Sequence, residues 1–161
     1  MSLLALKKNR PTSPSAVYGD LCKALDGEGI KYKTDANIFT VYSTFQGDDL
    51  PIKVEITVDK ENPFLCFNSL LDLQAPTESY KDILNGLNEL NAGLHFGAFI
   101  LDPESGRVMY RYHFMFAADY RPSQDLINGI LSMVVSTVDE HDGDLKRLIP
   151  ENTHFVDPMF G

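Results

Sequence analysis

His95 and His113 are the two residues whose spacing in the chain best suits metal binding. They lie in two apolar segments separated by the turn-like sequence 102–106, so a β-hairpin would bring the segments together. If Leu101 pairs with Arg107 in that hairpin, His95 lies opposite His113 with Cβ atoms ~5 Å apart. A zinc site needs a third protein ligand, and the sequence does not mark one. Two strand-end histidines without a metal are therefore the favoured interpretation, and no bound cofactor is expected.

The acidic run from Asp139 to Asp144 (Asp-Glu-His-Asp-Gly-Asp) looks at first like a calcium-binding loop. In such a loop the glycine is the sixth residue, and the first residue supplies a side-chain oxygen. If Gly143 were the sixth residue, the first would be Val138, whose side chain has no oxygen. The run also continues a helical apolar period. Its carboxylates are therefore expected mostly on the solvated face of a helix.

Sequence motifs of the common enzyme classes do not occur in this chain. There is no glycine-rich phosphate loop, no dinucleotide-binding fingerprint, no nucleophile elbow and no His-Glu-x-x-His zinc motif. Cys22 and Cys66 are far apart and neither belongs to a Cys-x-x-Cys pair, so both are expected to be reduced thiols that pack as small hydrophobes. The sequence therefore predicts a protein that is not an enzyme.

Composition is typical of a globular protein with an acidic excess. Of 161 residues, 43% are hydrophobic, and 14 Lys and Arg against 23 Asp and Glu give a formal charge of −9. Such a charge repels nucleic-acid phosphates and anionic lipid headgroups, so neither nucleic acid nor a membrane surface is an expected partner. The apolar run 3–6 is far shorter than the ~18 residues that indicate a membrane span. We expect a cytoplasmic protein.

Hydrophobic periodicity predicts a single α+β domain in the order α-β-β-β-α-β-β-α. Helical spacing occurs in the segments 15–26, 77–94 and 122–149, and strand patterns occur in 39–45, 52–58, 64–71, 96–101 and 107–115. We expect a twisted antiparallel sheet with the helices packed on it. Residues 14–149 are predicted to form this domain, between a flexible basic N-terminal tail at 1–13 and a C-terminal tail at 150–161.

The last two predicted strands carry apolar side chains on both faces of the sheet. With Leu101 opposite Arg107, one face is expected in the core and carries Val108, Tyr110, Tyr112 and Phe114 near Phe96, Ala98 and Ile100. The other face carries Phe99, Leu101, Met109 and Arg111. These are more large apolar groups than one layer of helices needs to cover. We therefore expect this second face to contact a partner protein, with its apolar groups burying area and Arg111 fixing orientation.

Three segments resemble the motifs of a known family. They are Leu87-Asn88-Glu89-Leu90-Asn91, Phe96-Gly97-Ala98-Phe99 and the stretch 102–112, which ends in Tyr110-Arg111-Tyr112. With the order of elements over 15–149, they resemble the YbjN-like proteins, small bacterial domains described as regulators of sensory transduction and similar in fold to type III secretion chaperones. The resemblance implies helices against a twisted antiparallel sheet, frequent dimerisation and binding of an extended polypeptide along an exposed sheet face. It implies no catalytic residues.

The leading hypothesis is a non-enzymatic protein-binding or chaperone-like regulatory module, acting as a homodimer, whose partner is another polypeptide. One alternative is a small-molecule-sensing domain with its ligand between the sheet and the long helix, held by Tyr110, Tyr112 and Arg111. Another is a metal-dependent enzyme built on His95 and His113.

Overall fold

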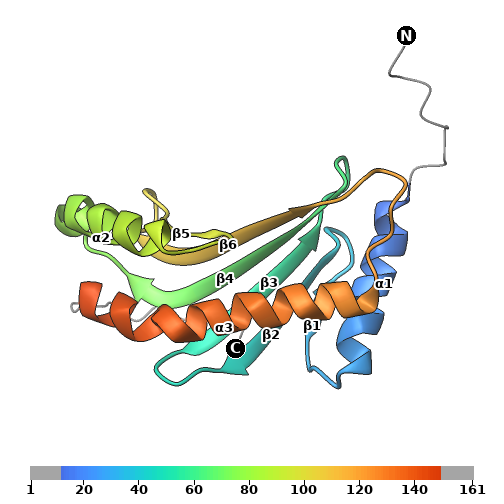
Figure 1. Ribbon diagram of the computed structural model, residues 1–161, viewed down its shortest axis with the longest axis horizontal. Helices are drawn as coiled ribbons and strands as arrows, with labels where there is room; N and C mark the ends of the chain where they lie inside the picture. Colours follow the sequence, from blue (N-terminus) through green and yellow to red (C-terminus); the bar gives the residue numbers. More distant parts are fainter. Residues whose placement is uncertain (1–11, 150–161) are drawn as a thin grey trace, which may run out of the picture.

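The computed structural model describes residues 12–149. Its helices are α1 (Pro14–Gly27), α2 (Tyr80–Ala92) and α3 (Gln124–Leu148), with a 3₁₀ turn η1 (Thr77–Ser79) before α2. Its strands are β1 (Lys33–Asp35), β2 (Thr40–Gln46), β3 (Pro51–Val58), β4 (Phe64–Gln74), β5 (Ala98–Leu101) and β6 (Arg107–Met115). The predicted α+β class is confirmed (Figure 1). The tails predicted at 1–13 and 150–161 lie, apart from Thr12 and Ser13, outside the described residues.

The strands form one antiparallel sheet in the order β1-β2-β3-β4-β6-β5. Strands β2, β3 and β4 form a meander, since short turns place consecutive strands side by side. Helix α2 then leads to the β5–β6 hairpin, in which β6 pairs with β4 and leaves β5 at the edge. The sequence pattern did not predict β1, because its three residues Lys-Thr-Asp carry no apolar alternation and it is recognised only by its pairing with β2.

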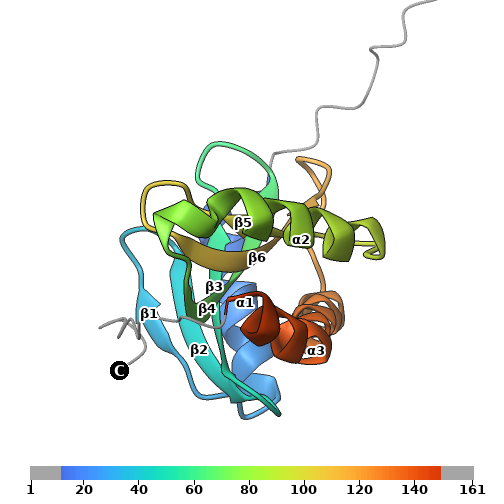
Figure 2. The same ribbon diagram turned by 90° about the vertical axis from the view of Figure 1, so that its left-hand side faces the viewer.

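Helices α1 and α3 pack on one face of the sheet, and α2 packs at its β5 edge. Helix α3 lies against β3, β4 and β6, and it also contacts α1, whereas α2 packs mainly on β5. Figure 2 shows α1 and α3 on the concave side of the curved sheet, with α2 beside its β5 edge. The apolar stripe of α3 explains this placement, since its buried residues recur at helical spacing: Ile127, Ile130, Leu131, Val134, Val138 and Leu145.

Strand β3 shows how the sequence assigns the two faces of the sheet. Its inward residues are fully buried: Ile52, Val54, Ile56 and Val58. They alternate with Lys53, Glu55 and Thr57, which are only half-buried on the opposite face. A period of two apolar and polar residues predicts a strand with one face in the core and one in contact with water, and that prediction is confirmed.

The β5–β6 hairpin closes one residue later than the sequence predicted. The Asp102 amide donates to the Arg107 carbonyl (2.9 Å) and the Gly106 amide donates back to the Asp102 carbonyl (2.8 Å), so Asp102 and Arg107 close the loop. Gly106 has a φ of 72°, a conformation that suits glycine. Leu101 consequently lies opposite Val108. The predicted pairing of Leu101 with Arg107 is wrong.

A one-residue change of register moves every side chain of β5 to the other face. Phe99 and Leu101 therefore lie in the core, at 1% and 9% exposure, while Ala98 and Ile100 face outward. The prediction that Phe99 and Leu101 share a surface with Met109 and Arg111 is wrong for this reason.

Candidate functional site: the outer face of the sheet

The face of the sheet opposite α1 and α3 is the candidate site, and we call it the outer face. Within residues 12–149 no helix lies over it (Figure 2). Its side chains come from four adjacent strands: Lys53, Glu55 and Thr57 of β3; Phe64, Cys66, Asn68, Leu70 and Asp72 of β4; Met109, Arg111, His113 and Met115 of β6; and Ala98 and Ile100 of β5. Met109 and Arg111 of the sequence-predicted surface lie here.

An apolar row crosses the outer face where Leu70, Met109 and Ile100 lie on adjacent strands in register. All three side chains are half-buried, although none of the helices within residues 12–149 covers them. At the β3 end of this row, Lys53 forms an ion pair of 2.7 Å with Asp72. The row is therefore a short apolar strip with a charged pair at one end, which suits contact with apolar side chains of an extended chain.

A polar row runs parallel to the apolar one, one step along the strands. Glu55, Asn68 and Arg111 are in register on β3, β4 and β6. The Asn68 amide donates to the Glu55 carboxylate (3.3 Å), and the Arg111 guanidinium donates through Nε to the Asn68 carbonyl oxygen (2.9 Å). Arg111 is exposed and also points an NH₂ group at the Met109 sulfur, 3.5 Å away. This chain of contacts orients the guanidinium, whose remaining donors suit a carboxylate or carbonyl.

Aromatic and sulfur-containing side chains complete the far end of the outer face. The Phe64 and His113 rings stack at 5.3 Å, and Met115 next to them is 75% exposed. Burial raises the pKa of the Cys66 thiol to about 11; nearby Arg111 lowers this pKa, and Glu55 raises it. A neutral thiol is a poor nucleophile, so Cys66 is a packing residue here.

Cys66 should react slowly with alkylating agents. In a Cys22→Ser background, we expect its rate with iodoacetamide near pH 8 to be about a hundredfold below that of a free cysteine, because a pKa raised by about two units lowers the thiolate fraction by that factor. The rate should keep rising above pH 9, and mass spectrometry of the alkylated protein measures it. A rate that levels off near pH 8.5 in the folded protein contradicts this expectation. After unfolding, the rate should match that of a free cysteine, and such a match does not contradict it.

The sequence-predicted histidine pair does not form. Strand β5 begins at Ala98, so His95 precedes it, and His113 lies opposite Cys66 on β4. Across residues 12–149 no group of three His, Cys, Asp or Glu side chains is placed to hold a metal ion. The pairing of His95 with His113 is wrong because it depended on the incorrect hairpin register.

The ligand contacts predicted for small-molecule sensing are also not brought together. Tyr110 is fully buried and its hydroxyl donates to the Phe96 carbonyl (2.7 Å), whereas Arg111 lies on the outer face. A groove of about 440 Å³ does lie between the start of the sheet and the long helix. Its lining includes Ile30, Phe45 and Leu131 but none of the three predicted contacts, so that ligand set is wrong.

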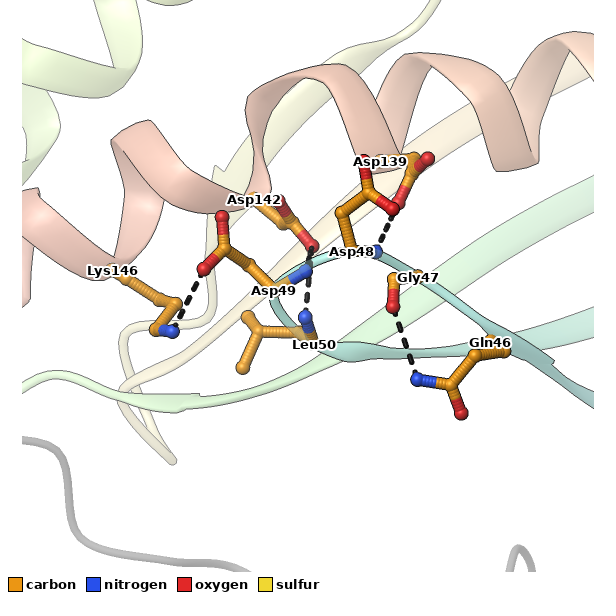
Figure 3. A network of polar contacts seen from close by, with 8 residues as sticks. All are labelled: Gln46, Gly47, Asp48, Asp49, Leu50, Asp139, Asp142 and Lys146. Atoms are coloured by element: carbon orange, nitrogen blue, oxygen red, sulfur yellow. Dashed lines mark hydrogen bonds and ion pairs between the residues drawn. The ribbon is translucent and has the colours of Figure 1, made fainter.

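Two carboxylates of the acidic run bind the β2–β3 turn, a contact that the sequence pattern did not predict. Asp142 is only 2% exposed, and its Oδ2 accepts from the backbone amides of Asp49 (3.2 Å) and Leu50 (2.9 Å) in the β2–β3 turn. Asp139 accepts from the Asp48 amide (2.8 Å), as Figure 3 shows. The expectation that these carboxylates face solvent is wrong for Asp142. Its partners are almost a hundred residues earlier in the chain, so local spacing carried no sign of the contact.

Sequence and structure comparisons agree on the nature of this chain. The family YbjN, described as "Putative bacterial sensory transduction regulator", matches residues 19–147. The chain belongs to the YbjN family. A crystal structure of YbjN from E. coli superposes on this YbjN-family protein with a TM-score of 0.58 at 11% identity, covering 77% of this chain and 90% of that one. A search among curated protein sequences gave no match.

Two solved complexes contain chains of the same fold. One is the ExsC–ExsE complex, with a TM-score of 0.55, 14% identity and coverage of 87% of this chain and 98% of that one. The other is the HopA1–SchA chaperone–effector complex, with a TM-score of 0.50, 16% identity and coverage of 83% and 97%. The predicted likeness in fold to type III secretion chaperones is confirmed. No helix in the described part of this YbjN-family protein is long and apolar enough to cross a membrane.

Proposed function

We propose that this YbjN-family protein is a non-enzymatic, chaperone-like regulatory module that acts in the cytoplasm and binds an extended segment of another polypeptide on the outer face. The observation that carries the proposal is the apolar row Leu70–Met109–Ile100 on a sheet face that no described helix covers. Chains of the same fold occur in a chaperone–effector complex, which supports a polypeptide as the partner class.

Each part of the outer face has a role in this binding. Leu70, Met109 and Ile100 are half-buried, so their remaining exposed surface is available to apolar side chains of the partner. Arg111, held by Asn68, is placed to bond a backbone carbonyl or a carboxylate of the same segment and thus set its orientation. A binding surface of this kind gains affinity from a few central apolar and arginine side chains.

The test is a double variant of the apolar row, Leu70→Ser with Met109→Ser. Affinity capture of the tagged protein from its native cytosol, followed by quantitative mass spectrometry, should show at least a ~10-fold loss of the bound polypeptide. Leu84→Ser is the matched control, because Leu84 is an exposed leucine (50%) on α2, away from the outer face. If the double variant is folded and recovers the same polypeptide as the wild type, the outer face is not the binding site.

The proposal includes a homodimer as the active form. Light scattering of the purified protein should then give twice the mass of one chain over a wide range of concentration. A single-chain mass at all concentrations contradicts this part of the proposal and leaves the outer-face test unaffected.

A further inference from the structure

The β5 edge of the sheet has backbone groups that point away from the sheet. Asp102 and Arg107 are a hydrogen-bonded pair, and such pairs alternate along antiparallel strands. The backbone groups of Ile100 and Ala98 therefore point toward β6. Those of Phe99 and Leu101 point outward, toward the position that another strand would occupy.

The side chain of Asn91 takes both outward-pointing groups of Phe99. Its Oδ1 accepts from the Phe99 amide (2.8 Å), and its Nδ2 donates to the Phe99 carbonyl (2.9 Å). A carboxamide has the same donor and acceptor as a peptide group, so Asn91 makes the two bonds that a neighbouring strand would make. This contact explains the last residue of the Leu-Asn-x-Leu-Asn motif, to which the proposed function assigns no role.

Packing of α2 holds Asn91 at this position. Ile83 and Leu87 bury the inner side of α2. Gly86 allows a close approach to α3, since a Cβ at this position would lie 2.5 Å from Cδ1 of Leu148. The Tyr110 hydroxyl fixes the connection that follows α2 by donating to the Phe96 carbonyl. The packing of α2 thus presents the amide of Asn91 to β5, and the two Asn91 bonds join the end of α2 to the sheet edge.

Strand β5 needs such protection because of its composition. Its sequence Ala-Phe-Ile-Leu contains no charged residue and no proline, which are the usual means of blocking an exposed strand edge. We propose that Asn91 closes the β5 edge at Phe99, and that without its amide the end of α2 no longer holds to β5, which then pairs in antiparallel fashion with β5 of a second copy. Such pairing is self-complementary about a two-fold axis. The inference concerns the sheet edge and does not depend on the proposed role of the outer face.

The test is Asn91→Ala, compared with the wild type by light scattering at equal concentration. We expect the average mass to rise by at least about two-fold. Hydrogen exchange is compared at a concentration low enough that the variant does not associate. The Phe99 amide should be protected from exchange in the wild type and unprotected in the variant. Asn88→Ala is the control, since Asn88 is exposed on the same helix, and it should keep the wild-type mass and protection.

A second variant separates edge pairing from general unfolding. Ile100→Lys places a charge on β5, which should return Asn91→Ala to the wild-type mass if association runs through this edge. Thr57→Lys adds the same charge on β3, away from the β5 edge, and should not return Asn91→Ala to the wild-type mass. Circular dichroism confirms that each variant is folded. An Asn91→Ala protein that is folded and keeps the wild-type mass, or association that Ile100→Lys leaves unchanged, overturns the proposal.

Discussion

Replacing Phe99 by alanine should lower the free energy of unfolding by about 3–5 kcal/mol. The ring is 1% exposed and packs against Tyr110 at 5.2 Å and, edge-on, against His141 at 5.8 Å. Removing it leaves a cavity between the sheet and α3, which the fixed backbone around it cannot fill. Urea denaturation followed by circular dichroism measures the change.

Met109→Ala is the matched comparison, because Met109 lies on β6 one strand away but points to the outer face. Its expected cost is below about 1 kcal/mol, typical of a partly exposed position. The sequence alone predicted that Phe99 and Met109 share one exposed surface, whereas the structure buries Phe99. The difference in cost between the two variants tells these two placements apart. Equal small costs for Phe99→Ala and Met109→Ala would contradict the hairpin register.

The helices and strands of this fold were predictable from the sequence because their periodicity is regular. The alternation of Ile52 to Val58 and the stripe of α3 each indicate one buried face. The register of the β5–β6 hairpin was not predictable in the same way. The register depends on whether Asp102 or Leu101 pairs with Arg107 at the end of the loop. The two alternatives differ by one residue, and the turn sequence fits both.

Only two of the four residues predicted for the binding surface lie on the outer face, because the predicted hairpin register was wrong by one residue. Met109 and Arg111 belong to the longer strand β6, whose pairing with β4 fixes their orientation. Phe99 and Leu101 belong to the short strand β5, and the loop sets which face of the sheet their side chains occupy. Leu70 was missed because the apolar run of β4 gave no sign of which residues face outward.

Replacing Asp142 by alanine should also cost several kcal/mol, about 2–4 in the free energy of unfolding. Asp142 is almost fully buried, and its Oδ2 is the acceptor for two backbone amides of the β2–β3 turn. Hydrogen bonds to a charged acceptor contribute roughly 1.5–3 kcal/mol each, and these two bonds are part-buried. Asp142→Asn retains an acceptor oxygen of the same size, so we expect it to lose less, about 1 kcal/mol.

The control is Asp144→Ala on the same helix. Asp144 is exposed and pairs with Arg147 three residues later, so its removal should cost less than about 1 kcal/mol. Thermal and urea unfolding measure all three variants. Amide exchange of Asp49 and Leu50 adds a local readout, since their protection should fall in Asp142→Ala and persist in Asp144→Ala.

Two further side-chain contacts join the β2–β3 turn to α3 beside Asp142. Figure 3 shows Asp139 on the Asp48 amide and Lys146 on the Asp49 carboxylate (3.0 Å) beside Asp142. Gly47 permits this approach, since a Cβ there would lie 2.9 Å from the Asp139 carboxylate. The three contacts join the turn to one face of α3, and only Asp142 is buried among them. If Asp142→Ala and Asp144→Ala cost the same, the turn is held by its own backbone and the acidic run is a solvated surface, as the sequence suggested.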